Sequence, residues 1–219
     1  MNRRNLLLAG TIVTGGLAIG FWPGGKPGDP GLLPGISAAN AQGTSEIEDI
    51  TLGDPNAPVK VVEYASFTCP HCAAFHQETF KDFRREYVDT GRVHFTYREV
   101  FFDRYGLWAA MIARCGGPER YFGIADLIYA QQSNWARAGE PAEVADALKK
   151  LGLQAGLSQA ELDACLQDAE QAQGLVNWYE ANAGADGIKS TPSFVIDGEV
   201  HSGNMSLDAL GELIDAAAS

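Results

Sequence analysis

The sequence predicts an α/β fold in which a helical domain is inserted between a β-α-β unit and a C-terminal β-β-α unit. Two stretches, 59–66 and 92–102, are rich in β-branched and aromatic residues and flank an amphipathic helix. The stretch 106–183 is rich in Ala, Leu, Glu and Gln, which favour helices. Strand character returns at 192–196, before a final amphipathic helix. The predicted order is β, β, α, β, a helical block, β, β, α, without an internal repeat.

The β-α-β unit contains one short strand and two long strands. Residues 47–53 predict the short strand, and the turn 54–58 separates it from the long strand 59–66. The second long strand covers 92–102. Because a helix connects the two long strands, we expect them to be parallel and joined by a right-handed crossover.

The connecting helix begins at the motif Cys69-Pro70-His71-Cys72. Pro70 suits the first helical position, where a missing backbone N–H costs nothing. An apolar stripe with spacings of 4, 4, 3 and 4 follows, formed by Cys72, His76, Phe80, Phe83 and Tyr87. The stripe places Cys72 on the buried face of the helix and leaves Cys69 at its exposed N-terminal end. Thr90-Gly91 ends the helix.

The inserted block carries helix-start signals at three places. Pro118 and Pro141 are at plausible first helical positions. Ser158 and Glu161 have the spacing of a capping box. Roughly four or five helices therefore fit between residues 106 and 183.

A hairpin and a helix are predicted after the inserted block. The strand 192–196 is followed by Asp197-Gly198, a pair typical of tight hairpin turns, and by the second arm Glu199-Val200-His201. The helix 206–218 closes the sequence. Its apolar face is formed by Leu207, Leu210, Leu213 and Ile214.

Composition and charge describe a soluble globular protein and exclude one class of partner. Hydrophobic residues make up 46% and charged residues 20% of the 219 residues, well away from the range of disordered chains. The formal net charge of -12 repels phosphate backbones. We therefore expect no nucleic-acid partner.

Residues 1–41 are predicted to be an export signal or an N-terminal anchor with a linker. The pair Arg3-Arg4 precedes an apolar run over 6–22, as in an export signal, and Ala39-Asn40-Ala41 has the small-x-small form of a cleavage site. The Pro- and Gly-rich stretch 23–31 has the composition of a linker. Two alternatives remain open, a cleaved signal or an uncleaved anchor that the linker tethers. The adjacent arginines also suit the twin-arginine export route.

The two cysteines of the Cys69-Pro70-His71-Cys72 motif are predicted to have different environments. Unpaired backbone N–H groups and the helix dipole favour an anion at Cys69, so its pKa is expected to fall well below about 8.5. His71, in the same turn, is expected to lower it further. Cys72 lies one turn into the helix and is expected to keep a high pKa and to act as the resolving thiol. A stabilised Cys69 thiolate favours the reduced enzyme, which predicts oxidation of substrate dithiols.

A zinc site is the alternative role for this motif. It needs two further ligands at a suitable spacing. Cys115 and Cys165 are isolated in the sequence, and His94 and His201 lie on different predicted strands. We therefore expect no metal and no other cofactor.

The other two cysteines, Cys115 and Cys165, fall 50 positions apart in the helical block. They are expected to form either a structural disulfide between two helices or a second redox pair. Neither has a helix-start setting that would lower its pKa, which favours the structural Cys115–Cys165 disulfide. An even number of cysteines in an exported protein agrees with disulfide formation.

Two segments of the sequence resemble the DsbA-like branch of the thioredoxin superfamily. They are Glu63-Tyr64-Ala65-Ser66-Phe67-Thr68-Cys69-Pro70-His71-Cys72 and Ser190-Thr191-Pro192-Ser193-Phe194-Val195-Ile196-Asp197-Gly198. The resemblance covers residues 45–219. It implies a thioredoxin fold over 45–105 and 185–219, interrupted by a helical domain at 106–184.

The resemblance also implies roles for individual residues. Cys69 would be the nucleophile and Cys72 the resolving thiol of a redox-active Cys69–Cys72 disulfide. Pro192 would be a cis-proline beside that disulfide, and Thr191 would offer backbone hydrogen bonds to a substrate peptide. Glu63 matches the family's buried acid beneath the active site, with a partly exposed strand glutamate as the alternative.

Two positions depart from the family's common pattern. Threonine before the cis-proline, here Thr191, occurs in some branches and in disulfide isomerases, whereas other oxidases carry valine there. The basic residue expected near the buried acid has no clear match, and Arg98 and His94 are the candidates.

The residues and the resemblance together predict an exported thiol-disulfide oxidoreductase that introduces disulfides into translocated proteins. The alternatives are a disulfide isomerase, a reductase such as those serving cytochrome maturation, and a non-enzymatic peptide-binding or chaperone-like module. The expected partners are thiols of unfolded or newly exported proteins and a quinone-linked membrane protein that reoxidises the cysteine pair. We expect a monomer in the periplasm, either free after signal cleavage or anchored in the membrane and facing the periplasm.

Overall fold

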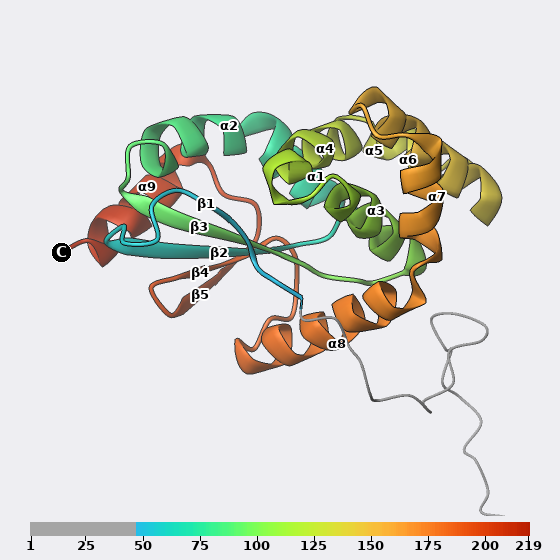
Figure 1. Cartoon of the computed structure of the whole chain (residues 1–219). Coiled ribbons are helices and arrows are strands. Elements are labelled where there is room, and N and C mark those ends of the chain that lie inside the picture. Colours follow the sequence, from blue (N-terminus) through green and yellow to red (C-terminus); the bar gives the residue numbers. More distant parts are fainter. Residues whose placement is uncertain (1–46) are drawn as a thin grey trace, which may run out of the picture. The chain divides into compact units, whose positions relative to one another are not determined.

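A five-stranded mixed sheet runs through the part of the chain that the computed structural model describes, residues 47–219 (Figure 1). The strands are β1 (Ile50–Leu52), β2 (Val59–Ala65), β3 (Val93–Glu99), β4 (Ser193–Ile196) and β5 (Glu199–Ser202). Their order is β1-β3-β2-β4-β5, with β2 and β3 parallel and all other neighbours antiparallel. The predicted α/β fold with an inserted helical block is therefore confirmed. The predicted signal or anchor at 1–41 lies outside the described residues.

Helices fill the connection from β2 to β3 and the long segment from β3 to β4. The first connection holds α1 (Pro70–Glu78), α2 (Phe80–Phe83) and the π-helical turn η1 (Arg84–Val88). The long segment holds α3 (Arg104–Cys115), α4 (Pro118–Ala130), α5 (Gln132–Trp135), α6 (Pro141–Gln154), α7 (Gln159–Gln167) and α8 (Ala169–Ala185). That is more than the four or five helices predicted, because α5 is a separate single turn. The helix α9 (Leu207–Ala217) follows the hairpin. Within residues 47–219, no helix combines the length and hydrophobicity needed to cross a membrane.

Capping residues explain where several of these helices begin. Pro118 and Pro141 are the first residues of α4 and α6, as predicted. Ser158 and Glu161 form the predicted capping box of α7, in which each backbone N–H donates to the side chain of the other residue. These local features remove or satisfy backbone donors that have no partner in a first helical turn.

The helix that follows Cys69 is interrupted, so the prediction of one continuous helix is wrong. α1 ends before Thr79, and α2 begins directly after it. Thr79 is β-branched, which disfavours helix, and its hydroxyl donates to the carbonyl oxygen of Met205 in the segment before α9. The apolar stripe nevertheless faces the core, because Cys72, His76, Phe80 and Phe83 are buried and Tyr87 is half-buried.

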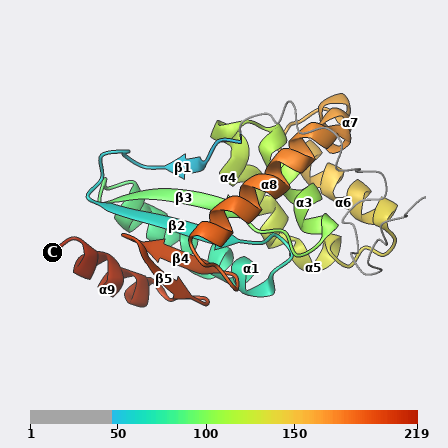
Figure 2. The same ribbon diagram turned by 90° about the horizontal axis from the view of Figure 1, so that it is seen from below.

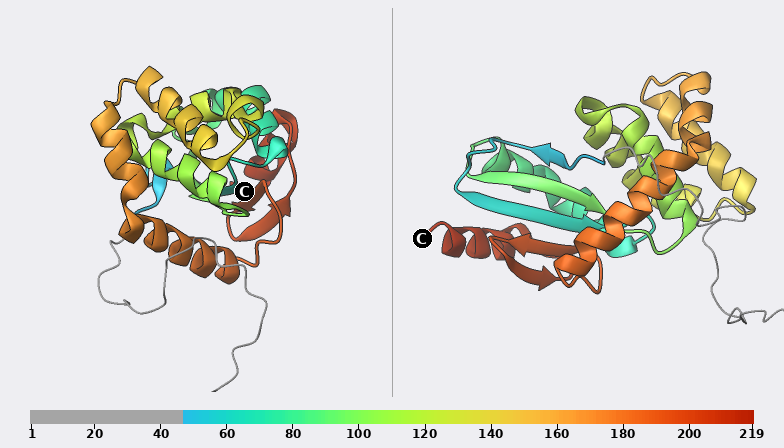
Figure 3. Two further views of the ribbon diagram at one scale, coloured as in Figure 1. Left: turned by 90° about the vertical axis from the view of Figure 1, so that its right-hand side faces the viewer. Right: turned by 60° about the horizontal axis from the view of Figure 1, so that its bottom comes forward.

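Different helices cover the two faces of the sheet. Alternate side chains of β2 point to opposite faces, so Val61 and Ala65 join the main apolar core with Ile214 of α9. Tyr64 instead packs with Ala183 of α8 in a second cluster. Figures 1 and 2 show α8 across the face opposite to α2 and α9. Figure 3 shows the helices α3 to α7 gathered beyond the end of the sheet where β2 and β3 end.

A disulfide joins Cys115 at the end of α3 to Cys165 in α7. The two cysteines are separated by 50 positions, and neither lies at the start of a helix. Closing a loop of this length contributes about 4 kcal/mol in the chain-entropy description of disulfides. This position, between two helices of the inserted block, favours the structural role over that of a second redox pair.

A buried ion pair between Glu99 and Arg114 links the end of β3 to α3. The Glu99 side chain is 1% exposed and that of Arg114 is 8% exposed. Nε and Nη2 of Arg114 donate to the two carboxylate oxygens of Glu99, each at 2.7 Å, and the hydroxyl of Tyr121 donates at 2.8 Å. Both oxygens of the Glu99 carboxylate thus accept hydrogen bonds. A charge that is buried to this degree requires such partners.

Candidate active site

The Cys69-Pro70-His71-Cys72 motif lies where β2 ends and α1 begins. Cys69 is the N-cap residue of α1, and Pro70 is the first helical residue, as predicted. Both cysteines are free thiols, and Cys72 is fully buried, while Pro70 and His71 are exposed. The prediction of an exposed Cys69 is wrong, since only 9% of it is accessible. The reason is tertiary: a loop containing Thr191 lies against its sulfur.

The surroundings of Cys69 stabilise its thiolate. A hydrogen bond from the Cys72 thiol has the largest effect on its pKa, and burial opposes it. The side chain of Thr191 and the backbone N–H groups of Cys72 and His71 add to the stabilisation and lower the pKa of Cys69 to about 5. His71 therefore acts on Cys69 through its backbone at the start of α1.

Cys72 has the opposite environment. Burial raises the pKa of the Cys72 thiol well above its ordinary value, and the hydrogen bond to Cys69 and the charge of Glu63 act in the same direction. At neutral pH the pair therefore consists of a thiolate at Cys69 and a thiol at Cys72. This is the difference in acidity that the motif predicts.

Glu63 is fully buried on β2, which excludes the partly exposed alternative. Its Oε2 lies 3.1 Å from Nε2 of His76, which is also buried. The prediction that Arg98 or His94 is the basic partner of Glu63 is wrong. On β3 the residue level with Glu63 is Tyr97, so the side chains of His94 and Arg98 point to the other face of the sheet.

The pairing of Glu63 with His76 was not predicted, although one signal was available. His76 follows Cys72 by four residues, which places it one turn further along the same face of α1. Its ring stacks on Tyr129, with centroids 4.4 Å apart, and meets Tyr97 edge-on. Among the described residues, neither Oε1 of Glu63 nor Nδ1 of His76 has a hydrogen-bond partner. The two residues form a buried acid–base pair on the Cys72 side of the sheet.

A loop before β4 covers the cysteine pair. The Thr191–Pro192 peptide bond is cis. β4 pairs with β2 so that Ser193 is opposite Tyr64, which brings this loop beside the end of β2. The sulfur of Cys69 lies 3.4 Å from the carbonyl oxygen of Thr191, to which its thiol donates in the protonated form. The structure thus brings together predicted site residues that are 122 positions apart in the sequence.

Two further side chains hold the segment between β2 and α1, and neither was predicted. The hydroxyl of Thr68 donates to Oδ2 of Asp103 at 2.9 Å, while Oδ1 of Asp103 caps α3. Nε2 of Gln132 donates to the carbonyl oxygens of Phe67 and Cys69, at 2.7 and 2.9 Å. These contacts span 35 to 65 positions, so no local pattern marks them.

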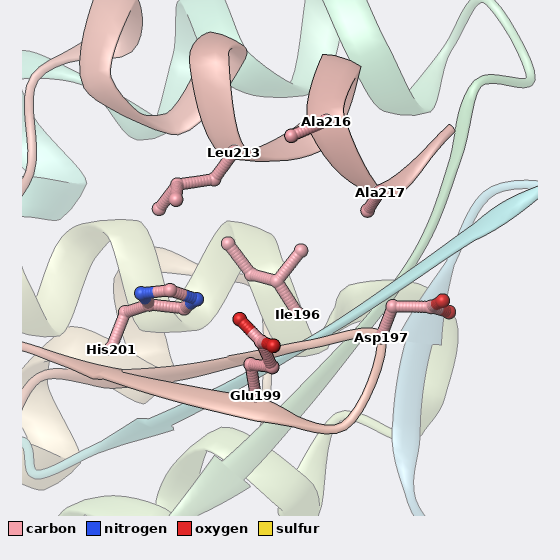
Figure 4. Close-up of a pocket in the computed structure, with 7 residues that line it drawn as sticks. All are labelled: Ile196, Asp197, Glu199, His201, Leu213, Ala216 and Ala217. Atoms are coloured by element: carbon pink, nitrogen blue, oxygen red, sulfur yellow. The ribbon is translucent and has the colours of Figure 1, made fainter. Parts of the chain in front are cut away.

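A surface cavity lies at the other end of the sheet, between the β4–β5 hairpin and α9 (Figure 4). Its lining residues are Ile196, Asp197, Glu199, His201, Leu213, Ala216 and Ala217. Ile196 pairs with Val61 near the start of β2, whereas Cys69 follows the end of β2. In the part of the chain that the structure describes, no three His, Cys, Asp or Glu side chains are grouped to hold a metal ion. The candidate active site is the cysteine pair, whose two thiols differ in acidity.

The low pKa of Cys69 predicts that the reduced protein loses stability as the pH falls. An unfolded cysteine has a pKa of about 8.5, and folding depresses that of Cys69 to about 5. The resulting stabilisation is fully present above about pH 8.5 and is lost progressively as the pH falls towards about 5. Urea unfolding measured between about pH 8.5 and about pH 5 should show this loss of stability in the reduced protein. A Cys69→Ser variant should lack it. Equal pH dependence in both would contradict a depressed Cys69 pKa.

The chain is similar to known proteins over most of the described residues. It matches the family described as Thioredoxin over residues 45–216. It is 34% identical over 185 residues to the "Putative protein-disulfide oxidoreductase" of Rickettsia conorii, covering 84% of the chain and 65% of that protein. A protein of the same name from Rickettsia felis is 34% identical over 170 residues, covering 77% of the chain and 60% of the relative. The chain thus spans less than two thirds of the length of these relatives.

Solved structures share the same fold. The crystal structure of α-DsbA1 from Wolbachia pipientis has a TM-score of 0.70 at 29% identity, covering 78% of this chain and 90% of that chain. A protein-disulfide isomerase from Novosphingobium aromaticivorans also has a TM-score of 0.70, at 24% identity. The match covers 78% of this chain and 97% of that chain. At that lower identity the likeness shows the fold alone.

Proposed function

Because the chain belongs to the thioredoxin family, as a DsbA-like disulfide oxidoreductase, we propose that it introduces disulfides into exported proteins through Cys69 and Cys72. The single observation that carries the oxidising direction is the unequal acidity of the two thiols. Cys69 has a pKa of about 5, and that of Cys72 is raised by burial. A stabilised thiolate favours the reduced enzyme, so electrons flow from substrate thiols to the Cys69–Cys72 disulfide.

The proposed reaction starts from the disulfide form. A substrate thiolate attacks the sulfur of Cys69, so that a substrate–Cys69 bond forms while the Cys69–Cys72 bond breaks. The electron pair goes to Cys72, which takes up a proton because its pKa is high. That proton is one of the two that the substrate thiols release. A second substrate thiolate then attacks the substrate sulfur, and Cys69 leaves as a thiolate. Two electrons pass to the enzyme, and the substrate gains one disulfide.

The proposal includes a compartment and partners. The arginine pair and apolar run within residues 1–41 support export to the periplasm, with or without retention as an anchor. The Cys115–Cys165 disulfide supports an oxidising compartment. Each cycle leaves the enzyme reduced, so the proposal requires a reoxidising partner, a quinone-linked membrane protein. The substrates are thiols of unfolded or newly exported proteins, and the enzyme works as a monomer.

The reduction potential of the purified protein tests the direction of the reaction. The fraction of oxidised protein is measured in a series of glutathione redox buffers. We expect a potential of about -180 to -120 mV, compared with about -270 mV for thioredoxin. A value at or below that of thioredoxin would make the protein a reductase.

A disulfide isomerase is the second candidate, supported by Thr191 beside Cys69, since threonine precedes the cis-proline in isomerases. Refolding of a test protein separates the two activities. An oxidase restores activity to the fully reduced test protein faster than to one with scrambled disulfides. The reverse order of rates would favour the isomerase.

A further inference from the structure

Gln132 connects the inserted helices to the backbone of Cys69. It is the first residue of the one-turn helix α5 and is half-buried. Its Nε2 lies 2.7 Å from the carbonyl oxygen of Phe67 and 2.9 Å from that of Cys69, and it donates to both. A primary amide has two N–H donors, so both are used on the segment that carries the reactive sulfur.

The Cys69 carbonyl group is also the first acceptor of α1, because the backbone N–H of Ala73 donates to it at 3.1 Å. A carbonyl oxygen carries partial negative charge, which disfavours an anion on the same residue. The Gln132 amide places the positive end of its dipole on this oxygen and offsets that charge. The same bonds hold Cys69 in its extended conformation, φ -82° and ψ 119°, from which the N–H groups of His71 and Cys72 reach its sulfur.

Burial and a hydrogen bond of Trp135 fix the position of the segment that carries Gln132. Trp135, in the same turn, is buried, and its indole N–H donates to the carbonyl oxygen of Ile128 at 2.8 Å. The Gln132 amide therefore meets Cys69 from a fixed position, so little ordering is needed when the thiolate forms.

We propose that Gln132 is a positioning residue that stabilises the thiolate of Cys69 and so makes the protein a stronger oxidant. The inference deepens the proposed function and rests on it. Gln132 acts through the backbone of Cys69. The inserted helical block thereby contributes to the redox chemistry in addition to covering the end of the sheet.

Two substitutions at this position test the proposal. Gln132→Met keeps the length of the side chain and removes both donors, and Gln132→Glu replaces the amide with a carboxylate of the same shape. The pKa of Cys69 is followed by the ultraviolet absorbance of the thiolate, and the redox equilibrium is measured in glutathione buffers. We expect Gln132→Met to raise the pKa by about half a unit to one unit and to shift the equilibrium about threefold to tenfold towards the disulfide form. Gln132→Glu should raise the pKa of Cys69 further and shift the redox equilibrium further towards the disulfide form. It tests the proposal if the methionine variant does not fold.

Gln77→Met is the matched control. It removes an amide-to-carbonyl bond of the same kind, from Nε2 of Gln77 on α1 to the carbonyl oxygen of Tyr129 at 2.9 Å, and this bond does not involve the backbone of Cys69. It should lower stability while leaving the pKa of Cys69 and the redox equilibrium unchanged. An unchanged pKa in the Gln132 variants, or an equal rise in Gln77→Met, would overturn the proposal. The potential of the unsubstituted protein tests the oxidase function separately, since the role of Gln132 depends only on the difference between variants.

Discussion

Replacing Cys72 with alanine is expected to trap the protein in a stable mixed disulfide at Cys69. The substitution removes the Cys72 hydrogen bond, but it keeps the Thr191 side chain and the backbone N–H groups at the start of α1, which also lower the pKa of Cys69. Cys69 therefore attacks a peptide disulfide readily, and without Cys72 no internal thiol releases the product. Cys69→Ala should form no comparable adduct, because burial keeps Cys72 protonated. Oxidation of a dithiol peptide should fall to the uncatalysed rate in both variants.

Mass spectrometry of the intact protein, after incubation with a peptide disulfide and acid quenching, measures the adduct. The matched control is the double variant Cys115→Ala/Cys165→Ala, which removes the other disulfide and should still turn over. Equal adduct yields in Cys72→Ala and Cys69→Ala would show that the two roles are not divided as proposed. Loss of turnover in the correctly folded control would show that the second disulfide takes part in the reaction.

Replacing Arg114 with methionine is expected to lower the free energy of unfolding by about 3–5 kcal/mol. The substitution leaves the Glu99 carboxylate buried, with the Tyr121 hydroxyl as its remaining side-chain donor. An uncompensated buried charge costs far more than the ion pair itself contributes. Urea denaturation followed by circular dichroism measures the loss.

The exposed pair of Arg92 and Asp215 supplies the control for this measurement. Their side chains are 46% and 64% exposed, so Arg92→Met should change stability by less than about 1 kcal/mol. The double variant Glu99→Leu/Arg114→Met removes both charges and should recover part of the loss. Similar losses in Arg114→Met and Arg92→Met would contradict the argument from burial.

Local signals in the sequence determined the order of the elements and the place of the redox pair. Pro70 marks the start of α1, and the spacing of Cys69 and Cys72 places them across its first turn. Asp197 and Gly198 adopt positive φ values of 49° and 92°, as their hairpin turn requires. Each of these features depends on residues within a few positions of one another, so the pattern alone predicts it.

The packing of distant segments decided what surrounds the two sulfur atoms. Cys69 is buried because the Thr191 loop, 122 positions away, lies against it. Glu63 meets His76 instead of Arg98, because the pleat of β3 turns Arg98 to the other face of the sheet. Gln132 reaches Cys69 across 63 positions. The sequence by itself determined that a cysteine pair begins a helix. The tertiary structure alone decided which groups set its acidity, because those contacts depend on how far-separated segments pack together.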